Sequence, residues 1–140
     1  MDRQWMINTM GVIANIRAAS RVLPDAGRII SVGAGLGSRV LFPGTTDNAA
    51  TKAAIVGYTR GAARDLGRRN ITVNVVQAGL MDTDMAARSL DKLPPIIMES
   101  LAIRRFASVE EAAAAIVFLA GPDAGYIIGS ILDVNGGYAA

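Results

Sequence analysis

The residues with the clearest chemical potential in this 140-residue chain are an amide and an amine four positions apart. Asn48 and Lys52 open and close the segment Asn48-Ala49-Ala50-Thr51-Lys52. Positions i and i+4 of an α-helix share one face, so both side chains are expected to point the same way. A lysine near a helix start gains nothing from the helix dipole, which is already positive there. The pair marks a candidate site, and a solvated lysine is the competing interpretation.

Closely spaced glycines follow a β-branched run, in the order Gly33-Ala34-Gly35-Leu36-Gly37-Ser38. In dinucleotide-binding proteins such glycines bring backbone N–H groups to a pyrophosphate at a helix N-terminus. Here Ser38 stands at the third glycine position, and residues 39–44 do not open a helix. The segment is therefore interpreted as a plain loop.

Two further charged groups have mainly structural interpretations. Arg60, Arg64 and Arg68 recur at i, i+4 and i+8, which favours a solvated face, with an anion-binding patch as the alternative. Asp82 and Asp84 have no third ligand nearby, so they are assigned to turn chemistry and no metal site is predicted.

Composition excludes several kinds of catalysis. The sequence has no cysteine and no histidine, which removes thiolate nucleophiles, cysteine–zinc sites, imidazole ligands and Ser-His-Asp chemistry. A net charge of only +2 gives no reason to expect nucleic acid as a partner. The longest apolar stretch, 112–121, is about half of what a membrane span requires. With no signal peptide in the sequence, a soluble cytoplasmic protein is expected.

Hydrophobic periodicity predicts the elements that must position these groups. Apolar residues at three- and four-residue spacing predict a helix over 5–22 with one buried face, namely Met6, Met10, Ile13, Ile16 and Ala19. Short apolar runs predict strands at 28–32, 71–76 and 131–134. Further helices are expected over 48–66 and, from a capping box at Ser108, through Leu119. The segment 79–107, broken by Pro94-Pro95, is interpreted as an irregular, mobile flap.

The alternation α-β-α-β-α-β predicts an α/β fold in a single domain, 1–140, with helices on both faces of a parallel sheet. Three strands are few, since a sheet usually has about five or six. The fold class is therefore a partial doubly wound, Rossmann-like three-layer sheet from which the first nucleotide-binding half is absent. Its first strand would be an open edge.

Several segments, in this order, resemble the C-terminal half of the short-chain dehydrogenase/reductase family. They are Asn8, residues 27–33 (GRIISVG), 42–44 (FPG), 50–54 (ATKAA), 71–76 (ITVNVV), Gly79, 83–85 (TDM), 128–130 (IGS) and 133–137 (DVNGG). The resemblance covers nearly the whole chain.

The resemblance implies an NAD(P)-dependent oxidoreductase with a substrate-holding serine, a tyrosine acid/base, a lysine and an asparagine. Lys52 and Asn8 stand at the lysine and asparagine positions. Asn48 replaces the tyrosine and Ala34 replaces the serine, so the proton donor and the hydroxyl are lost. The resemblance also implies cofactor contacts for Lys52, Gly79 and Thr83, which are weak without the other half of the fold.

These departures predict a degenerate, truncated family member, a pseudoenzyme that cannot transfer hydride alone. No cofactor is expected for this chain by itself, and NAD(P) is expected if a partner or a longer product completes it. The expected partner is a second copy or a full-length relative, bound through the helices at about 5–22 and 48–66, with neither nucleic acid nor membrane involved.

Two other functions stay open at this stage. One is an active NAD(P)-dependent oxidoreductase acting on a carbonyl or alcohol, if the chain is a fragment of a longer product. The other is a non-redox cyclase, isomerase or dehydratase that uses Lys52 as a base beside Asp47.

Overall fold

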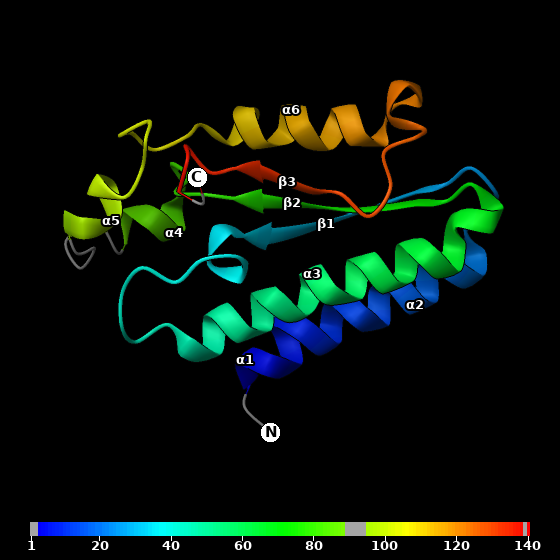
Figure 1. Cartoon of the computed structure of the whole chain (residues 1–140), viewed down its shortest axis with the longest axis horizontal. Coiled ribbons are helices and arrows are strands. Elements are labelled where there is room, and N and C mark those ends of the chain that lie inside the picture. The colour runs from blue at the N-terminus through cyan, green and yellow to red at the C-terminus, as the bar shows by residue number, and fades with distance from the viewer. Residues whose placement is uncertain (1–2, 89–94, 139) are drawn as a thin grey trace.

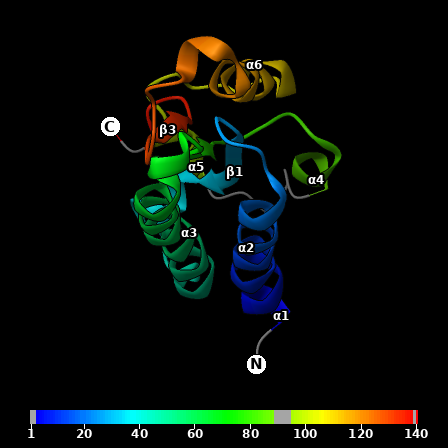
Figure 2. The same ribbon diagram turned by 90° about the vertical axis from the view of Figure 1, so that its right-hand side faces the viewer.

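The protein has three layers around a parallel sheet. The computed structural model describes residues 3–88, 95–138 and 140. The strands β1 (Arg28–Ala34), β2 (Thr72–Ala78) and β3 (Ile131–Val134) run in the spatial order β1-β2-β3, with Arg28 opposite Thr72 and Val75 opposite Ile131. The helices α2 (Val12–Val22) and α3 (Thr46–Leu66) cover one face, and α6 (Val109–Ala120) covers the other (Figures 1 and 2). The predicted α/β fold is confirmed.

Two hydrophobic cores hold the layers together, one on each face of the sheet. Ile16, Ile29, Ile71 and Val73 pack with α3 residues on one side, and Val76 packs with Leu119 of α6 on the other. Strand β2 lies between these cores and is buried along nearly its whole length. Continuous burial of this kind is typical of a central parallel strand and explains its run of β-branched residues.

The first helix differs from its predicted pattern. A short helix α1 (Arg3–Trp5), a π-helical segment η1 (Met6–Gly11) and α2 follow one another without a break. Ile16 is buried as expected, but Met6 and Met10 are 48% and 43% exposed, so their assignment to the buried face was wrong. Thr9 is buried on that face instead, because its hydroxyl donates a 3.3 Å hydrogen bond to the Thr51 carbonyl of α3.

The segment after β2 is less irregular than predicted. It contains α4 (Asp84–Ala87) and α5 (Pro95–Glu99), while residues 89–94, including Pro94, lie outside the described residues. Ile97 and Leu101 are only 7% and 4% exposed. The interpretation of this segment as a flap separate from the core is therefore wrong for these residues, because they pack into the carboxyl end of the sheet.

Helix α6 begins at the predicted capping box. The Ser108 hydroxyl accepts a hydrogen bond from the Glu111 N–H, and the Ser108 N–H donates to Glu111 Oε2 at 2.8 Å. Arg105 adds a two-pronged ion pair to the same carboxylate. These donors lower the pKa of Glu111 to about 2. No helix in the described ranges is long and apolar enough to span a membrane.

A buried amide on β2 fixes the loop that leads into β3. Asn74 is fully buried, its Nδ2 donates to the Ile127 carbonyl at 2.8 Å, and its Oδ1 accepts from the Ser130 N–H at 2.9 Å. The two loop groups gain partners that the strand ladder does not provide. A buried polar group without such a partner is costly, so Asn74 determines how residues 127–130 approach the sheet.

We predict that Asn74→Leu lowers the free energy of unfolding by about 2–5 kcal/mol, because two backbone groups lose their partner. Urea unfolding followed by circular dichroism measures this. Asn15→Ala is the control, since Asn15 makes an exposed hydrogen bond to the Gly11 carbonyl. Its effect is expected to stay within about 0.5 kcal/mol. Equal stability of Asn74→Leu and the unmodified protein would contradict the role given to Asn74.

Candidate functional site

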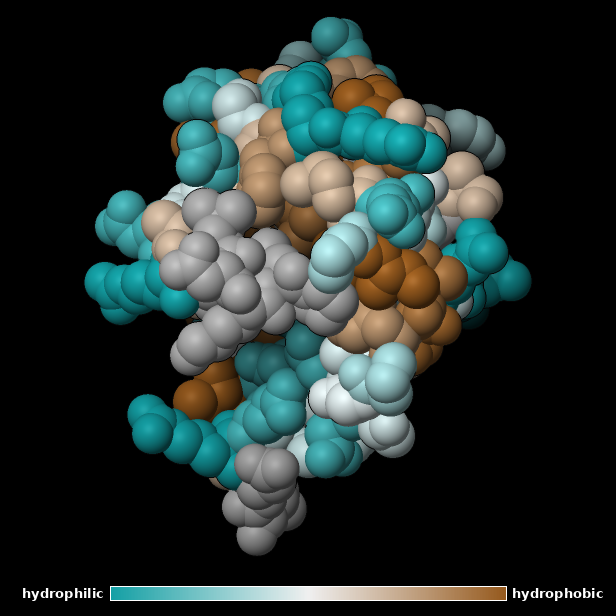
Figure 3. Space-filling model, turned by 90° about the vertical axis from the view of Figure 1, so that its left-hand side faces the viewer, coloured by the Kyte–Doolittle hydropathy of each residue, from teal (hydrophilic) through white to brown (hydrophobic). Residues whose placement is uncertain are grey.

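A mainly apolar cavity of about 310 Å³ lies at the carboxyl ends of β1 and β2. The segment that follows β1, which includes the 3₁₀ turn η2 (Gly35–Gly37), forms one side, and the start of α3 and the segment after β2 form the others. Figure 3 looks onto this end of the sheet and shows hydrophobic side chains among hydrophilic ones. The lining residues are Ala34, Gly35, Leu36, Phe42, Thr45, Asn48, Ala78, Gly79, Leu80, Ile97, Leu101 and Tyr138. A cavity of this size and character suits a small molecule with an apolar body.

Three of the residues selected from the sequence meet at this cavity. Ala34 ends β1, Gly79 follows β2, and Asn48 lies in the first turn of α3. The Asn48 side chain is half-buried, and within the described residues no hydrogen bond engages its amide. Its two N–H donors and its oxygen are thus available to a bound molecule.

Three other selected residues lie away from the cavity lining. Lys52 is half-buried, and burial lowers the pKa of its ammonium. Asn8 donates to the Thr51 hydroxyl at 3.4 Å. The Thr83 hydroxyl accepts from the Ala86 N–H and caps α4. The i, i+4 spacing therefore places Asn48, but not Lys52, in the cavity wall.

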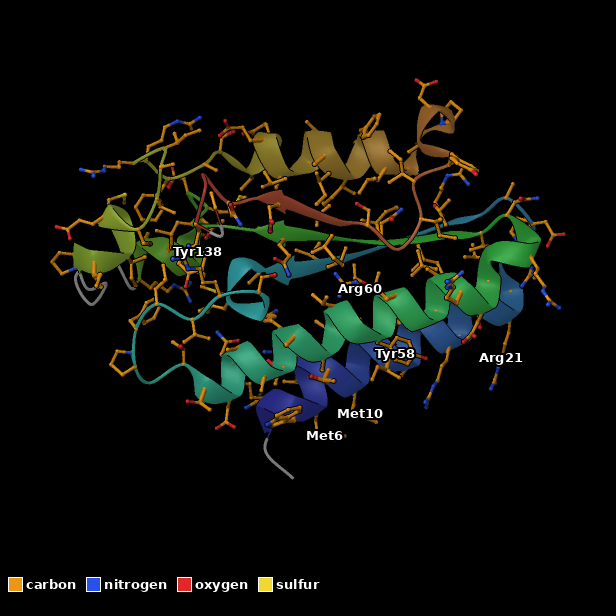
Figure 4. The ribbon with its side chains drawn as sticks, viewed as in Figure 1. Met6, Met10, Arg21, Tyr58, Arg60 and Tyr138 are labelled. Carbon is orange, nitrogen blue, oxygen red and sulfur yellow. The ribbon has the colours of Figure 1, made fainter. Side chains whose placement is uncertain are left out.

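Tyr138 is a wall residue that the sequence analysis missed. Its ring lies against Gly35, where an added Cβ would come within 2.8 Å of the ring, and its hydroxyl donates to the Arg39 carbonyl at 3.2 Å. Burial raises the pKa of this phenol. Figure 4 labels Tyr138 beside the carboxyl ends of the strands. The only sequence signal was its place after Gly136-Gly137, where both glycines have positive φ.

Tyr58 is not an alternative proton donor for this cavity. Its half-buried ring packs against the core formed by α2, α3 and the sheet, and its hydroxyl accepts a 3.2 Å hydrogen bond from Arg17 Nε. This agrees with the helix period, which places Tyr58 about 240° around the helix from Lys52, six positions earlier. Neither described tyrosine near α3 or η2 thus offers its hydroxyl to Asn48.

Comparison with known proteins identifies the family. A sequence profile described as enoyl-(acyl carrier protein) reductase matches residues 1–139. The chain belongs to the short-chain dehydrogenase/reductase family. It is 36% identical over its whole length to the cyclic-di-GMP-binding biofilm dispersal mediator protein of Escherichia coli K12. It spans 59% of that relative's length.

Solved structures agree with this assignment. A Serratia marcescens short-chain dehydrogenase/reductase double mutant superimposes with a TM-score of 0.91 at 41% identity, covering 99% of this chain and 56% of that one. A blue fluorescent protein from a metagenomic library, solved in complex with NADPH, gives 0.87 at 43% identity over 96% and 54% of the two chains. The chain thus spans little more than half of the proteins it matches.

The described residues fit a dinucleotide cofactor only in part. The resemblance assigns contacts to Lys52, Gly79 and Thr83. Gly79 and Thr83 follow β2 in the chain, and the Lys52 backbone lies against Gly37, just after β1. Lys52 has no ion-pair partner in the described part of the chain, whereas the Thr83 hydroxyl already caps a helix.

The described residues show no metal site. Residues 3–88, 95–138 and 140 hold no cluster of three His, Cys, Asp or Glu residues that suits a metal ion.

Gly79, which lines the cavity, lies in close contact with the backbone of Asn135. A Cβ at this position would lie 2.6 Å from Asn135 Cα, which belongs to the main chain. Asn135 is itself fixed, because its Nδ2 donates to Asp133 and its Oδ1 accepts from the Gly137 N–H. A side chain at residue 79 therefore has no room without moving the end of β3.

We predict that Gly79→Ala lowers the free energy of unfolding by about 1–3 kcal/mol through overpacking. Gly61→Ala is the matched control, because a Cβ there meets no atom within 4 Å. In a helix interior this change is expected to stabilise by about 0.5–1 kcal/mol. Urea unfolding of both variants gives the comparison, and an unfolding free energy for Gly79→Ala as high as that of the unmodified protein would contradict the close contact.

Proposed function

We propose that the protein is a family member that does not transfer hydride by itself and instead acts as a noncatalytic or subunit-completing partner. The observation that carries this proposal is the Asn48 amide in the cavity wall, which has no hydrogen-bond partner among the described residues. An amide neither gives nor takes a proton near neutral pH, whereas a phenol beside a cation does. Ala34, at the serine position, adds no hydroxyl.

The same residues support binding of a carbonyl compound. The Asn48 N–H groups are hydrogen-bond donors for a ligand oxygen, and the apolar wall from Phe42, Ile97 and Leu101 suits the carbon skeleton. The residues thus hold and orient a ligand while moving no proton. NAD(P), when bound, would supply hydride chemistry, and Lys52 and Gly79 would lie at its nicotinamide end.

A subunit-completing role is supported by the outer edge of β1, which has no neighbouring strand in the described residues. The Gly27 carbonyl accepts a hydrogen bond from the Thr72 N–H. The backbone N–H and C=O groups of every second residue, counted from Gly27, therefore point toward β2. The backbone groups of Arg28, Ile30 and Val32 therefore face outward. Val32 is also 55% exposed. A partner strand placed along this edge would pair those groups and cover Val32.

A second candidate function is non-redox catalysis with Lys52 as the base. The specific observation in its favour is the lowered pKa of the half-buried ammonium, which increases the neutral fraction of the amine. It ranks below the first proposal because Lys52 does not line the cavity that holds Asn48. Turnover that survives Lys52→Ala would eliminate it.

We predict that the purified chain does not oxidise NADPH or NADH in the presence of ethyl acetoacetate. The same protein is expected to bind this carbonyl probe, and Asn48→Ala to weaken that binding by about three- to tenfold through loss of one hydrogen bond. Cofactor absorbance and ligand-observed NMR measure the two properties, with Asn15→Ala as a control for binding. Cofactor turnover at about 1 s⁻¹ or faster, within the ordinary range of enzymes, would refute the noncatalytic proposal.

We further propose self-association through the helices at 5–22 and 48–66. The apolar side chains of Met6, Ile7 and Met10 are exposed on η1, which packs beside α3. Figure 4 labels Met6 and Met10 on this outer surface. Gly57 on the exposed face of α3 leaves room for a closely packed helix, since a Cβ at this position meets nothing within 4 Å. A second copy is the occupant favoured here.

Native mass spectrometry is expected to show a dimer of the unmodified chain. Met6→Glu together with Met10→Glu should produce a monomer, because each change places a charge in the proposed apolar contact. Met85→Glu is the control, as Met85 is 80% exposed but lies on α4. A stable monomer of the unmodified protein at micromolar concentration would count against the interface.

A further inference from the structure

Three arginines on successive turns surround a surface hollow that lies away from the Asn48 cavity. Arg60 and Arg64 belong to α3, and Arg68 belongs to the following 3₁₀ turn η3 (Gly67–Arg69). With Ile128 and Gly129 opposite, they line a groove of about 570 Å³. Gly129 donates to the Val73 carbonyl near the start of β2, whereas the Asn48 cavity lies at the other end of this strand.

Within the part of the chain that the structure describes, the positive charges in this groove have no internal counter-charge. The ion pairs in the described residues join Arg69 to Asp25 and Arg105 to Glu111. Neither an ion pair nor a side-chain hydrogen bond engages the guanidinium groups of Arg60, Arg64 and Arg68 in the described ranges. Asp65, the nearest carboxylate in sequence, is exposed and forms no ion pair with them.

Helix stability does not account for three cations in this arrangement. A cation in the last turn of a helix interacts favourably with the helix dipole, but the effect fades within one turn. Arg60 lies more than one turn before Leu66, the last residue of α3. Like charges at i and i+4 destabilise a helix by a few tenths of a kcal/mol. The row of Arg60, Arg64 and Arg68 therefore destabilises the helix locally, and a bound anion would offset this repulsion.

The opposite wall of the groove is held in place before any ligand arrives. Asn74 binds the Ile127 carbonyl and the Ser130 N–H, on either side of the groove residues Ile128 and Gly129. A Cβ on Gly129 would lie 3.5 Å from the Ala63 Cβ, so the loop and the helix are in close contact at the floor. Ala63 and Ile128 make that floor apolar.

We propose that this groove binds a ligand with two phosphate groups and an attached apolar or aromatic part. A guanidinium donates two parallel N–H groups to a phosphate, and successive arginines of the row are about 6 Å apart along the helix axis. More than one phosphate is needed to satisfy such a row. Ile128 supplies the contact for the remainder of the ligand. A nucleoside diphosphate has this chemistry, and the groove volume suits a ligand of that size.

Isothermal titration calorimetry of the full chain with ADP tests the site. ADP is expected to bind more tightly than AMP, and the affinity is expected to fall as salt increases. Arg60→Gln together with Arg64→Gln should weaken ADP binding about tenfold or more, since two charged hydrogen-bonding groups are lost. Arg64→Lys should give a smaller loss, because it keeps the charge without the two-pronged geometry.

Matched variants separate this site from other sources of ADP binding. Arg21→Gln, on α2, should leave the affinity unchanged; Figure 4 labels Arg21 and Arg60 on their different helices. Lys52→Ala reports ADP binding at the carboxyl end of the sheet, which is the alternative position for this ligand. Thermal unfolding verifies that the double variant is folded. Absence of ADP binding by the unmodified chain overturns the proposal. An equal loss in Arg21→Gln, or a loss confined to Lys52→Ala, does so as well.

Discussion

The structure depends on the burial of β2, because a buried polar group on an enclosed strand is costly unless it finds a hydrogen-bond partner. Asn74 meets this requirement in the middle of the strand by binding the loop at 127–130. That loop leads directly into β3, so its position sets the register in which Val75 faces Ile131. The register in turn brings Asn135 against Gly79 and places Tyr138 beside Gly35. One buried amide thus connects the amino end of the sheet to the wall of the candidate site.

The candidate site separates two properties that are combined in a catalytic tyrosine. A phenol hydroxyl both donates a hydrogen bond and titrates, whereas the Asn48 amide retains only the donation. The surrounding apolar residues leave a cavity of about 310 Å³, large enough for a small molecule. Under the proposed function, recognition of a carbonyl oxygen is compatible with the absence of proton transfer, since the two depend on different properties of the same side chain.

Local pattern predicted those parts of the fold whose stability is local. The capping box at Ser108 and the strand at 131–134 were correct to the residue, because side-chain geometry and β-branched runs determine them. Strands β1 and β2 continue to Ala34 and Ala78, beyond the predicted ends, since ladder pairing extends through residues of low strand propensity.

Among the residues of the candidate site, Asn48, Ala34 and Gly79 were found from their motif positions. Tyr138 and Leu101 were missed as wall residues because contacts distant in sequence place them. The Tyr138 hydroxyl, for example, binds a carbonyl 99 residues earlier in the chain, and no periodicity within one segment reports such a contact. The exposure of Met10 likewise depends on a contact with another helix. Its neighbour Thr9 hydrogen-bonds to Thr51 of α3 and takes the buried face that Met10 was expected to fill.

The parallel pairing of the three strands affects the rate at which the chain folds. Arg28 meets Thr72, and Val75 meets Ile131, only after long intervening stretches have been brought together. Closing such loops loses chain entropy before any strand contact compensates, so folding is expected to be slow relative to that of a helical bundle of similar size. The helix α3 and strand β2 adjoin in sequence and pack together, so we expect them to associate early in folding. The cavity draws its walls from four separate segments and is therefore among the last regions to acquire its final shape during folding.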